Sequence, residues 1–188
     1  MKKIMFNDRY GLTQAVLDGR KTMTRRIVPD GTPLGNWEET VKKSRYKVGE
    51  VVAVAESYEA IRNERYKDYC NDIYNPFGAK GPDLESEPGW TNKMFVRADL
   101  MPHRIRITNI KVERLQDISH EDCLKEGIMY QDGYFCGYKV STPNMAFGAM
   151  TAQQAFAALI DKVSGKGTWD SNPYVFVYEF ELLEGGEQ

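Results

Sequence analysis

The chain has 188 residues, of which 41% are apolar and 28% are charged, a composition typical of one globular domain. Its net charge of −2 disfavours extensive wrapping of nucleic acid. Residues 1–62 nevertheless contain twelve Lys or Arg against eight Asp or Glu, so this part is positive. No run approaches the ~18 apolar residues of a membrane helix, and Asn7-Asp8-Arg9 interrupts any apolar leader. We therefore expect a cytoplasmic protein without a membrane segment.

The cysteines and histidines argue against disulfides and against a bound metal. Cys70, Cys123 and Cys136 are odd in number and widely spaced, which favours a reducing compartment. There is no Cys-x-x-Cys or His-x-x-x-His pair, and the two histidines are His103 and His120. We expect a protein that needs neither a metal nor a cofactor.

Hydrophobic periodicity and turn residues predict an α+β domain that covers residues 1–188. A one-residue slip in the apolar alternation near Asn109 predicts a β-bulge, which suits a small, mostly antiparallel β-barrel flanked by helices. Residues 62–93 lack a periodic apolar pattern and are predicted to be a long irregular insertion. The expected strands are 3–6, 22–28, 50–58, 94–97, 104–115 and 174–182; the expected helices are 9–17, 119–126 and 151–164; a hairpin is expected in 128–140.

The most informative stretch is 18–28, Asp-Gly-Arg-Lys-Thr-Met-Thr-Arg-Arg-Ile-Val. Gly19 is a helix-stop signal, and the residues after it alternate as in a strand. An amine, a hydroxyl and several guanidiniums thus lie within eight residues. By spacing alone, a solvated basic hairpin is the more common interpretation of such a pattern, and a ligand site is the alternative.

The residues themselves resemble a known family. The pattern Gly19-x-Lys21-x-x-Thr24-x-Arg26 resembles the ASCH superfamily, whose members are small β-barrels related to the PUA fold. Within that superfamily, Gly-Arg-Lys-Thr-x-Thr is closest to bacterial amidohydrolases that deacetylate acetylcytidine. A longer, phage-associated branch is similar through Lys-Thr-x-Thr-Arg-Arg at 21–26 and Trp-Asp-x-Asn-Pro at 169–173. The resemblance implies a PUA-like barrel. It does not extend to the middle of the chain.

The resemblance also implies a catalytic set of Lys21, Thr24 and Glu126. Metal-independent amide hydrolysis would use Thr24 as nucleophile, Lys21 as its base and Glu126 as general acid and positioning group. Burial and the neighbouring arginines would lower the pKa of Lys21, whereas a carboxylate beside it would raise that pKa. The sequence leaves this conflict open.

Other residues are candidates for substrate contact. Arg20, Arg25 and Arg26 flank the catalytic positions, and any of them could hold the substrate or an oxyanion. Glu56 and Tyr58 share the core-facing parity of a buried strand, so Glu56 lies either at the wet end of that strand or in a pocket. The aromatic residues of the insertion either stack on a base as part of a lid or fasten the loop to the body; they are Tyr66, Tyr69, Tyr74, Phe77 and Trp90.

Two main functions remain open at this stage. The first is hydrolysis of an acylated cytidine or a similar modified nucleoside. The second is a non-catalytic module that binds a nucleotide or short single-stranded RNA. The acidic overall charge favours a small ligand, because affinity for a polymer grows with the number of phosphates neutralised. A third possibility, an accessory protein of a phage or mobile element, rests on the phage-like resemblance alone.

Overall fold

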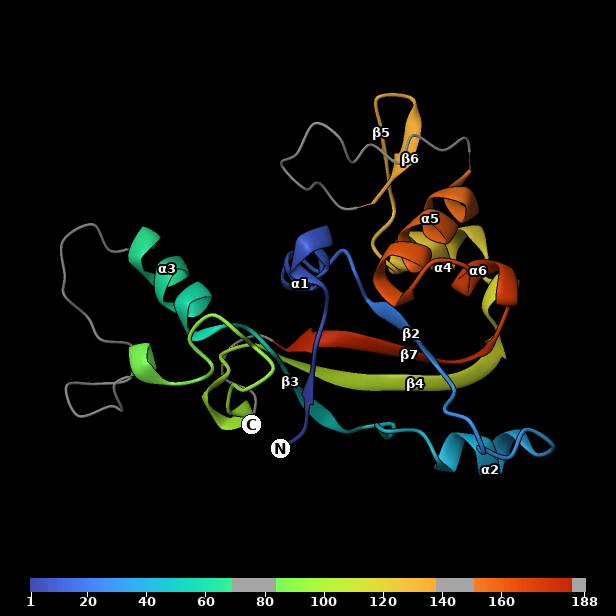
Figure 1. Ribbon diagram of the computed structural model, residues 1–188, viewed down its shortest axis with the longest axis horizontal. Helices are drawn as coiled ribbons and strands as arrows, with labels where there is room; N and C mark the ends of the chain where they lie inside the picture. The colour runs from blue at the N-terminus through green and yellow to red at the C-terminus, as the bar shows by residue number, and fades with distance from the viewer. Residues whose placement is uncertain (69–83, 138–150, 184–188) are drawn as a thin grey trace.

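A computed structural model describes residues 1–68, 84–137 and 151–183 (Figure 1). These residues form an α+β structure around a mixed five-stranded sheet of order β1-β3-β4-β7-β2. The strands are β1 (Lys3–Ile4), β2 (Met23–Ile27), β3 (Val51–Val54), β4 (Arg104–Arg114) and β7 (Tyr174–Leu183). Only the β1–β3 pair is parallel among them. In the described part of the chain, β1 and β2 are the edges of an open sheet, so the expected closed barrel is not found.

The two long strands β4 and β7 form the centre of the sheet. Their register shifts between Ile107 and Asn109, which confirms the predicted β-bulge. Successive residues of a strand point to opposite faces, yet Val175, Phe176, Val177 and Tyr178 are all buried. The sheet is therefore covered on both faces at β7.

Helices lie on both sides of these strands. Figure 1 shows α1 (Leu12–Leu17), α4 (His120–Lys125) and α5 (Ala152–Ser164) on one side of β4 and β7, with α2 (Trp37–Lys42) on the other. Thr151 and Gln154 form a capping box at the start of α5, and Gly165 ends this helix. A short helix, α6 (Thr168–Ser171), follows. The core between helices and sheet includes Leu12, Leu115, Phe156 and Val175.

Two predicted elements were wrong in detail. The expected helix over 9–17 is divided, because Gly11 takes a φ of +66° between a 3₁₀ turn (Asp8–Tyr10) and α1. Residues 94–97 are not a strand: their carbonyls at Met94 and Val96 accept hydrogen bonds from Lys3 Nζ at 2.6 and 2.8 Å. By contrast, the hairpin is confirmed as β5 (Met129–Gln131) and β6 (Tyr134–Cys136).

The predicted irregular insertion at 62–93 begins inside a helix. Helix α3 spans Tyr58–Asp68, and Ser57 Oγ caps it by accepting from the Ala60 N–H at 3.1 Å. The sequence of this helix shows no apolar stripe, because few of its described side chains face the protein interior. Among them, Tyr58 and Ile61 pack with Val96 and Met101 in a small second core. Trp90 packs against this core, and the Arg62 guanidinium lies 4.6 Å from its ring, so this aromatic fastens the segment. Tyr69, Tyr74 and Phe77 lie outside the described residues, and nothing is described of the Tyr66 side chain.

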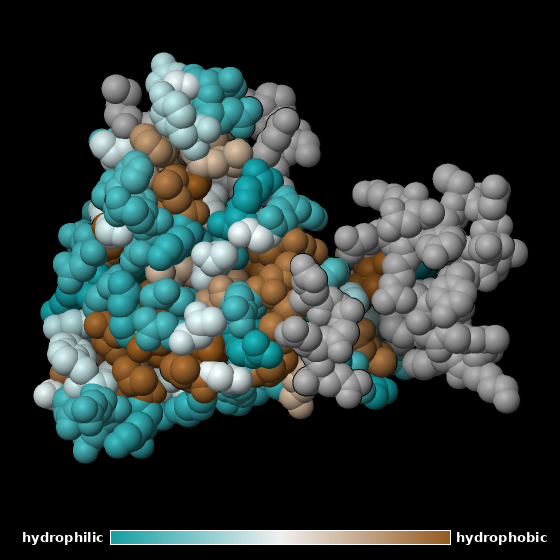
Figure 2. All heavy atoms as spheres, turned by 180° about the vertical axis from the view of Figure 1, so that it is seen from behind, coloured by the Kyte–Doolittle hydropathy of each residue, from teal (hydrophilic) through white to brown (hydrophobic). Residues whose placement is uncertain are grey.

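The surface combines polar and apolar regions. Figure 2 shows the back of the molecule, where apolar side chains emerge in patches between polar ones. No helix within the described ranges is long and apolar enough to cross a membrane.

Candidate active site

A tight turn places Lys21 between α1 and α4. Gly19 follows α1 with a φ of +70°, and the N–H groups of Arg20 and Lys21 both donate to Ala15 O. Thr22 N–H then donates to Lys125 O at the end of α4. Gly127, with a φ of +99°, comes so close that a Cβ there would lie 3.7 Å from Lys21 Cβ. The backbone therefore holds Lys21 against the C-terminal end of α4.

Lys21 and Glu126 form a buried ion pair. Lys21 Nζ lies 2.5 Å from Glu126 Oε2 and also donates to the carbonyl oxygens of Met23 and Glu126, at 2.7 and 2.9 Å. Lys21 is 2% exposed and Glu126 4% exposed. Glu126 is the residue directly after α4, whose N-terminus is capped by Ser119. All three donor directions of the ammonium are thus occupied inside the protein.

Arg25 extends this pair into a larger charged network. Its guanidinium donates to Glu126 Oε1 at 3.2 Å, to Asp122 Oδ2 at 2.9 Å and to Glu113 Oε1 at 2.6 Å. Lys111 Nζ lies 2.9 Å from Glu113 Oε2 and 3.2 Å from Asp122 Oδ2. We call these three cations and three carboxylates the charged cluster: Lys21, Arg25, Lys111, Glu113, Asp122 and Glu126.

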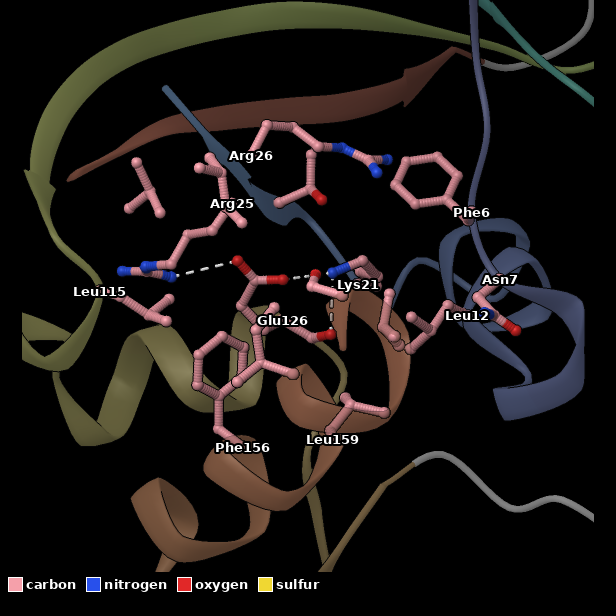
Figure 3. Close-up of a pocket in the computed structure, with 16 residues that line it drawn as sticks. Phe6, Asn7, Leu12, Lys21, Arg25, Arg26, Leu115, Glu126, Phe156 and Leu159 are labelled. Carbon is pink, nitrogen blue, oxygen red and sulfur yellow. Dashed lines mark hydrogen bonds and ion pairs between the residues drawn. The ribbon is translucent and has the colours of Figure 1, made fainter. Parts of the chain in front are cut away.

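A pocket of about 250 Å³ opens beside this cluster (Figure 3). Lys21, Thr24 and Glu126 all line it, so the structure brings the three predicted catalytic residues to one cavity. Its apolar wall includes Phe156 and Leu159 of α5, and Thr24 is 4% exposed. In Figure 3 the Glu126 carboxylate lies between Arg25 and Lys21, with a dashed line to each. We call this cavity the first pocket; its lining combines apolar side chains with the charged groups of Lys21, Arg25 and Glu126.

The neutral amine form is more favourable for the buried Lys21 than for a lysine in water. Burial lowers the pKa of Lys21; the Glu126 carboxylate raises it, and Arg26 and Arg25 lower it again, with a net downward shift. The conflict that the sequence left open is thus decided mainly by desolvation. Burial lowers the pKa of the Arg25 guanidinium, but its carboxylate partners outweigh this effect, so Arg25 stays charged.

The predicted substrate contacts are only partly gathered here. Arg25 and Arg26 line the pocket, but Arg25 is engaged by three carboxylates, and Arg26 Nη2 donates to Met5 O at 2.6 Å. Arg20 is exposed, pairs with Asp18 at 2.9 Å and is absent from the lining. In Figure 3 the Arg26 side chain extends toward Phe6.

Glu56 and Tyr58 lie elsewhere in the fold and do not line this pocket. Glu56 is buried and its carboxylate lies 2.7 Å from His103 Nδ1. The Tyr58 hydroxyl accepts from the Arg97 N–H at 2.8 Å, and its ring packs beneath Gly89. The structure therefore does not bring these two predicted substrate contacts to this pocket. The expected strand 50–58 ends at Val54, and Tyr58 begins α3 in the second core.

Sequence reasoning missed Glu113, Asp122 and Lys111. One signal was present, since Asp122 and Glu126 are four residues apart and share a helix face. Lys111 and Glu113 likewise share a strand face. Nothing in the sequence indicated that both faces would meet Arg25.

No group of three His, Cys, Asp or Glu suited to a metal ion occurs among residues 1–68, 84–137 and 151–183.

Comparison with known proteins assigns no family. No family model and no curated protein matches this chain. Among solved structures, protein EF3133 from Enterococcus faecalis V583, of the family DUF984, is similar with 11% identity and a TM-score of 0.40. The alignment covers 92% of this chain and 66% of that one, so the chain spans just under two thirds of its relative's length. At this TM-score the likeness assigns neither a fold nor a function.

Proposed function

We propose that the first pocket catalyses metal-independent hydrolysis of the amide bond in an acylated cytidine-type nucleoside. The observation that supports this proposal is the buried 2.5 Å contact of Lys21 with Glu126 at the floor of a pocket that Thr24 also lines. The substrate class comes from the ASCH-like pattern at 19–26. The proposal includes an evolutionary relationship between this chain and the PUA-like barrels.

The pair can supply both a base and an acid because it shares one proton. With that proton on Glu126, Lys21 is a neutral amine and Glu126 is a carboxylic acid. Lys21 then accepts the proton of the Thr24 hydroxyl as Thr24 Oγ attacks the acyl carbon. Glu126 donates its proton to the cytidine N4 as the C–N bond breaks, which leaves an acyl ester on Thr24.

The second half of the reaction regenerates the protein. Transfer of the proton from Lys21 back to Glu126 restores the base and the acid. Lys21 accepts a proton from water as it attacks the ester, and Glu126 returns a proton to Thr24 Oγ. The overall change is addition of one water to the amide, which gives cytidine and a carboxylic acid. The apolar wall at Phe156 and Leu159 limits competing water.

The test is turnover of N4-acetylcytidine and related acyl cytidines, with cytidine and acetate measured by mass spectrometry. We expect Thr24→Ala, Lys21→Arg and Glu126→Gln each to lower kcat/KM about 100-fold or more, with losses that do not add. Lys21→Arg is informative because a guanidinium stays protonated and cannot act as the base. Arg20→Ala is the matched control, since Arg20 follows the same turn but does not line the pocket.

A binding module would give a different result. Folded wild-type protein would then turn over no acyl cytidine, Thr24→Ala would have little effect, and Lys21→Arg would retain most ligand affinity. That outcome would replace the hydrolase by the non-catalytic alternative.

A further inference from the structure

A second pocket, of about 310 Å³, lies beyond the edge strand β2. Val175 lines the first pocket and Phe176 the second. Because neighbouring residues of a strand point to opposite faces, the two pockets draw on opposite faces of β7, with Phe176 and Tyr178 both on the side of the second pocket. Four cationic side chains line the second pocket: Lys3, Arg26, Lys43 and Arg45.

Among the residues that the structure describes, no carboxylate balances these cations. The lining contains no Asp or Glu, and within the described ranges none of the four forms an ion pair. Lys3 Nζ donates to two carbonyls instead. Burial lowers the pKa of Lys3, and repulsion from Arg45 lowers it further. Glu50, whose charge acts on Tyr46, is ion-paired with Lys2 at 3.0 Å. An anion in this pocket would relieve a repulsion that the fold leaves in place.

The rest of its wall is apolar or aromatic and consists of Met5, Ile27, Pro29, Tyr46, Phe176 and Tyr178. Tyr46 and Tyr178 pack edge to face with ring centroids 5.2 Å apart, and the Arg45 guanidinium lies 5.6 Å from the Tyr46 ring. Tyr46 is held in place because its hydroxyl donates to Lys3 O at 3.0 Å. Several cations around a preformed pocket suit a phosphate group, which can accept several charge-assisted hydrogen bonds at once.

The two pockets meet at β2. Arg26 and Ile27 line both of them, and the Arg26 side chain reaches from β2 to the Met5 carbonyl. The same N-terminal segment contributes Lys3 and Met5 to the second pocket and Phe6 and Asn7 to the first. One ligand that bends around this edge could therefore contact both.

We propose that the second pocket binds a phosphate group of the molecule whose base occupies the first pocket. The substrate is then a nucleotide, not a free nucleoside. This inference rests on the proposed function for the identity of the base. The phosphate can be the monoester of a mononucleotide or a diester within a short strand, since both present the same anionic oxygens.

The test compares the affinities of cytidine, cytidine 5′-monophosphate and a single-stranded pentacytidylate by titration calorimetry. We expect wild-type protein to bind the monophosphate about 10-fold more tightly than cytidine, as charge-assisted hydrogen bonds would give. In the variant Lys43→Ala/Arg45→Ala this ratio should fall toward one. Both side chains are exposed, so the variant should fold normally.

The matched control is Lys42→Ala/Lys166→Ala. It removes the same charge from two exposed lysines, one of them the immediate neighbour of Lys43, and neither lines the pocket. The control should keep the wild-type ratio. Equal binding of cytidine and its monophosphate by wild-type protein, no binding of either, or an equal loss in the control would each overturn the proposal.

Two further comparisons identify the molecule that carries the phosphate and test the phosphate site separately from the proposed hydrolysis. Tighter, strongly salt-dependent binding of the pentacytidylate identifies a strand as the source of the phosphate, and binding no tighter than the monophosphate identifies a mononucleotide. A preserved ratio without hydrolysis of acyl cytidines would refute the proposed reaction and leave the phosphate site standing. Hydrolysis without the ratio would refute the phosphate site alone.

Discussion

Replacement of Glu126 by Gln should destabilise the fold in a pH-dependent way. The change keeps the size of the side chain but removes the carboxylate that lies 2.5 Å from Lys21 Nζ. Arg25 would keep Glu113 and Asp122 as charged partners, whereas Lys21 would lose its carboxylate and keep only uncharged acceptors, among them two backbone carbonyls. The variant therefore leaves one buried ammonium group without a counter-charge.

The size of the effect follows from that stranded charge. Removing one partner of a buried ion pair typically costs about 3–5 kcal/mol. We expect the lower end, about 3 kcal/mol at neutral pH, because Lys21 keeps both carbonyl acceptors and can lose its proton. For a chain of this length that corresponds to a fall in Tm of about 6–12 °C.

The pH dependence has a definite sign. Burial already lowers the pKa of folded Lys21 from 10.5, and without Glu126 the pKa falls further because the raising effect of the carboxylate is lost. Between that lowered pKa and 10.5 the unfolded chain binds more protons than the folded chain, so the free energy of unfolding rises with pH in this interval. The deficit of the variant should therefore shrink as the solution becomes more alkaline.

Urea denaturation at several pH values measures this effect, with Glu113→Gln as the matched control. Glu113 also contacts Arg25, but its removal leaves Arg25 and Lys111 with other carboxylates, so a loss of about 1 kcal/mol or less is expected. A Glu126→Gln loss below about 1 kcal/mol, or one independent of pH, would refute the assignment of Lys21 as a buried, desolvated amine.

Two further predictions concern a thiol and a metal. Cys123 is fully buried, and burial raises its pKa to about 12, so iodoacetamide at pH 8 should modify it only after unfolding, as peptide mapping by mass spectrometry would reveal. Rapid modification of Cys123 in the native protein would contradict this. Incubation with a chelator should change neither Tm nor acyl cytidine turnover, given the absence of a ligand cluster in the described ranges; a stoichiometric zinc in the purified protein would contradict that expectation.

Much of the site could be predicted because local signals fixed it. Gly19 ends α1, so Lys21 necessarily lies in the turn that begins β2, and Gly127 ends α4 one residue after Glu126. The ASCH-like pattern then selected Lys21 and Thr24 among many polar residues. Long-range packing could not be predicted in the same way. Strand parity places Glu56 on a buried face, but it does not say that His103 and the second core cover that face.

Arg25 shows most clearly what the sequence left undetermined. The sequence suggested a free guanidinium for substrate, but β4 and α4 bring three carboxylates to it. The charged cluster contains three cations and three carboxylates, so it is neutral as a whole, although Lys21 faces only one of those carboxylates closely. That carboxylate is divided between two cations, with Oε2 on Lys21 and Oε1 on Arg25.

This division has a chemical consequence for Lys21. A carboxylate that Arg25 also binds neutralises Lys21 less completely, so desolvation can still lower the pKa of the amine while the cluster remains balanced. Arg25 thereby acts on the candidate base through Glu126 without needing to touch a substrate. Under the proposed mechanism Arg25 is therefore a positioning residue, and Glu113 and Asp122 offset the repulsion between its guanidinium and the buried Lys21.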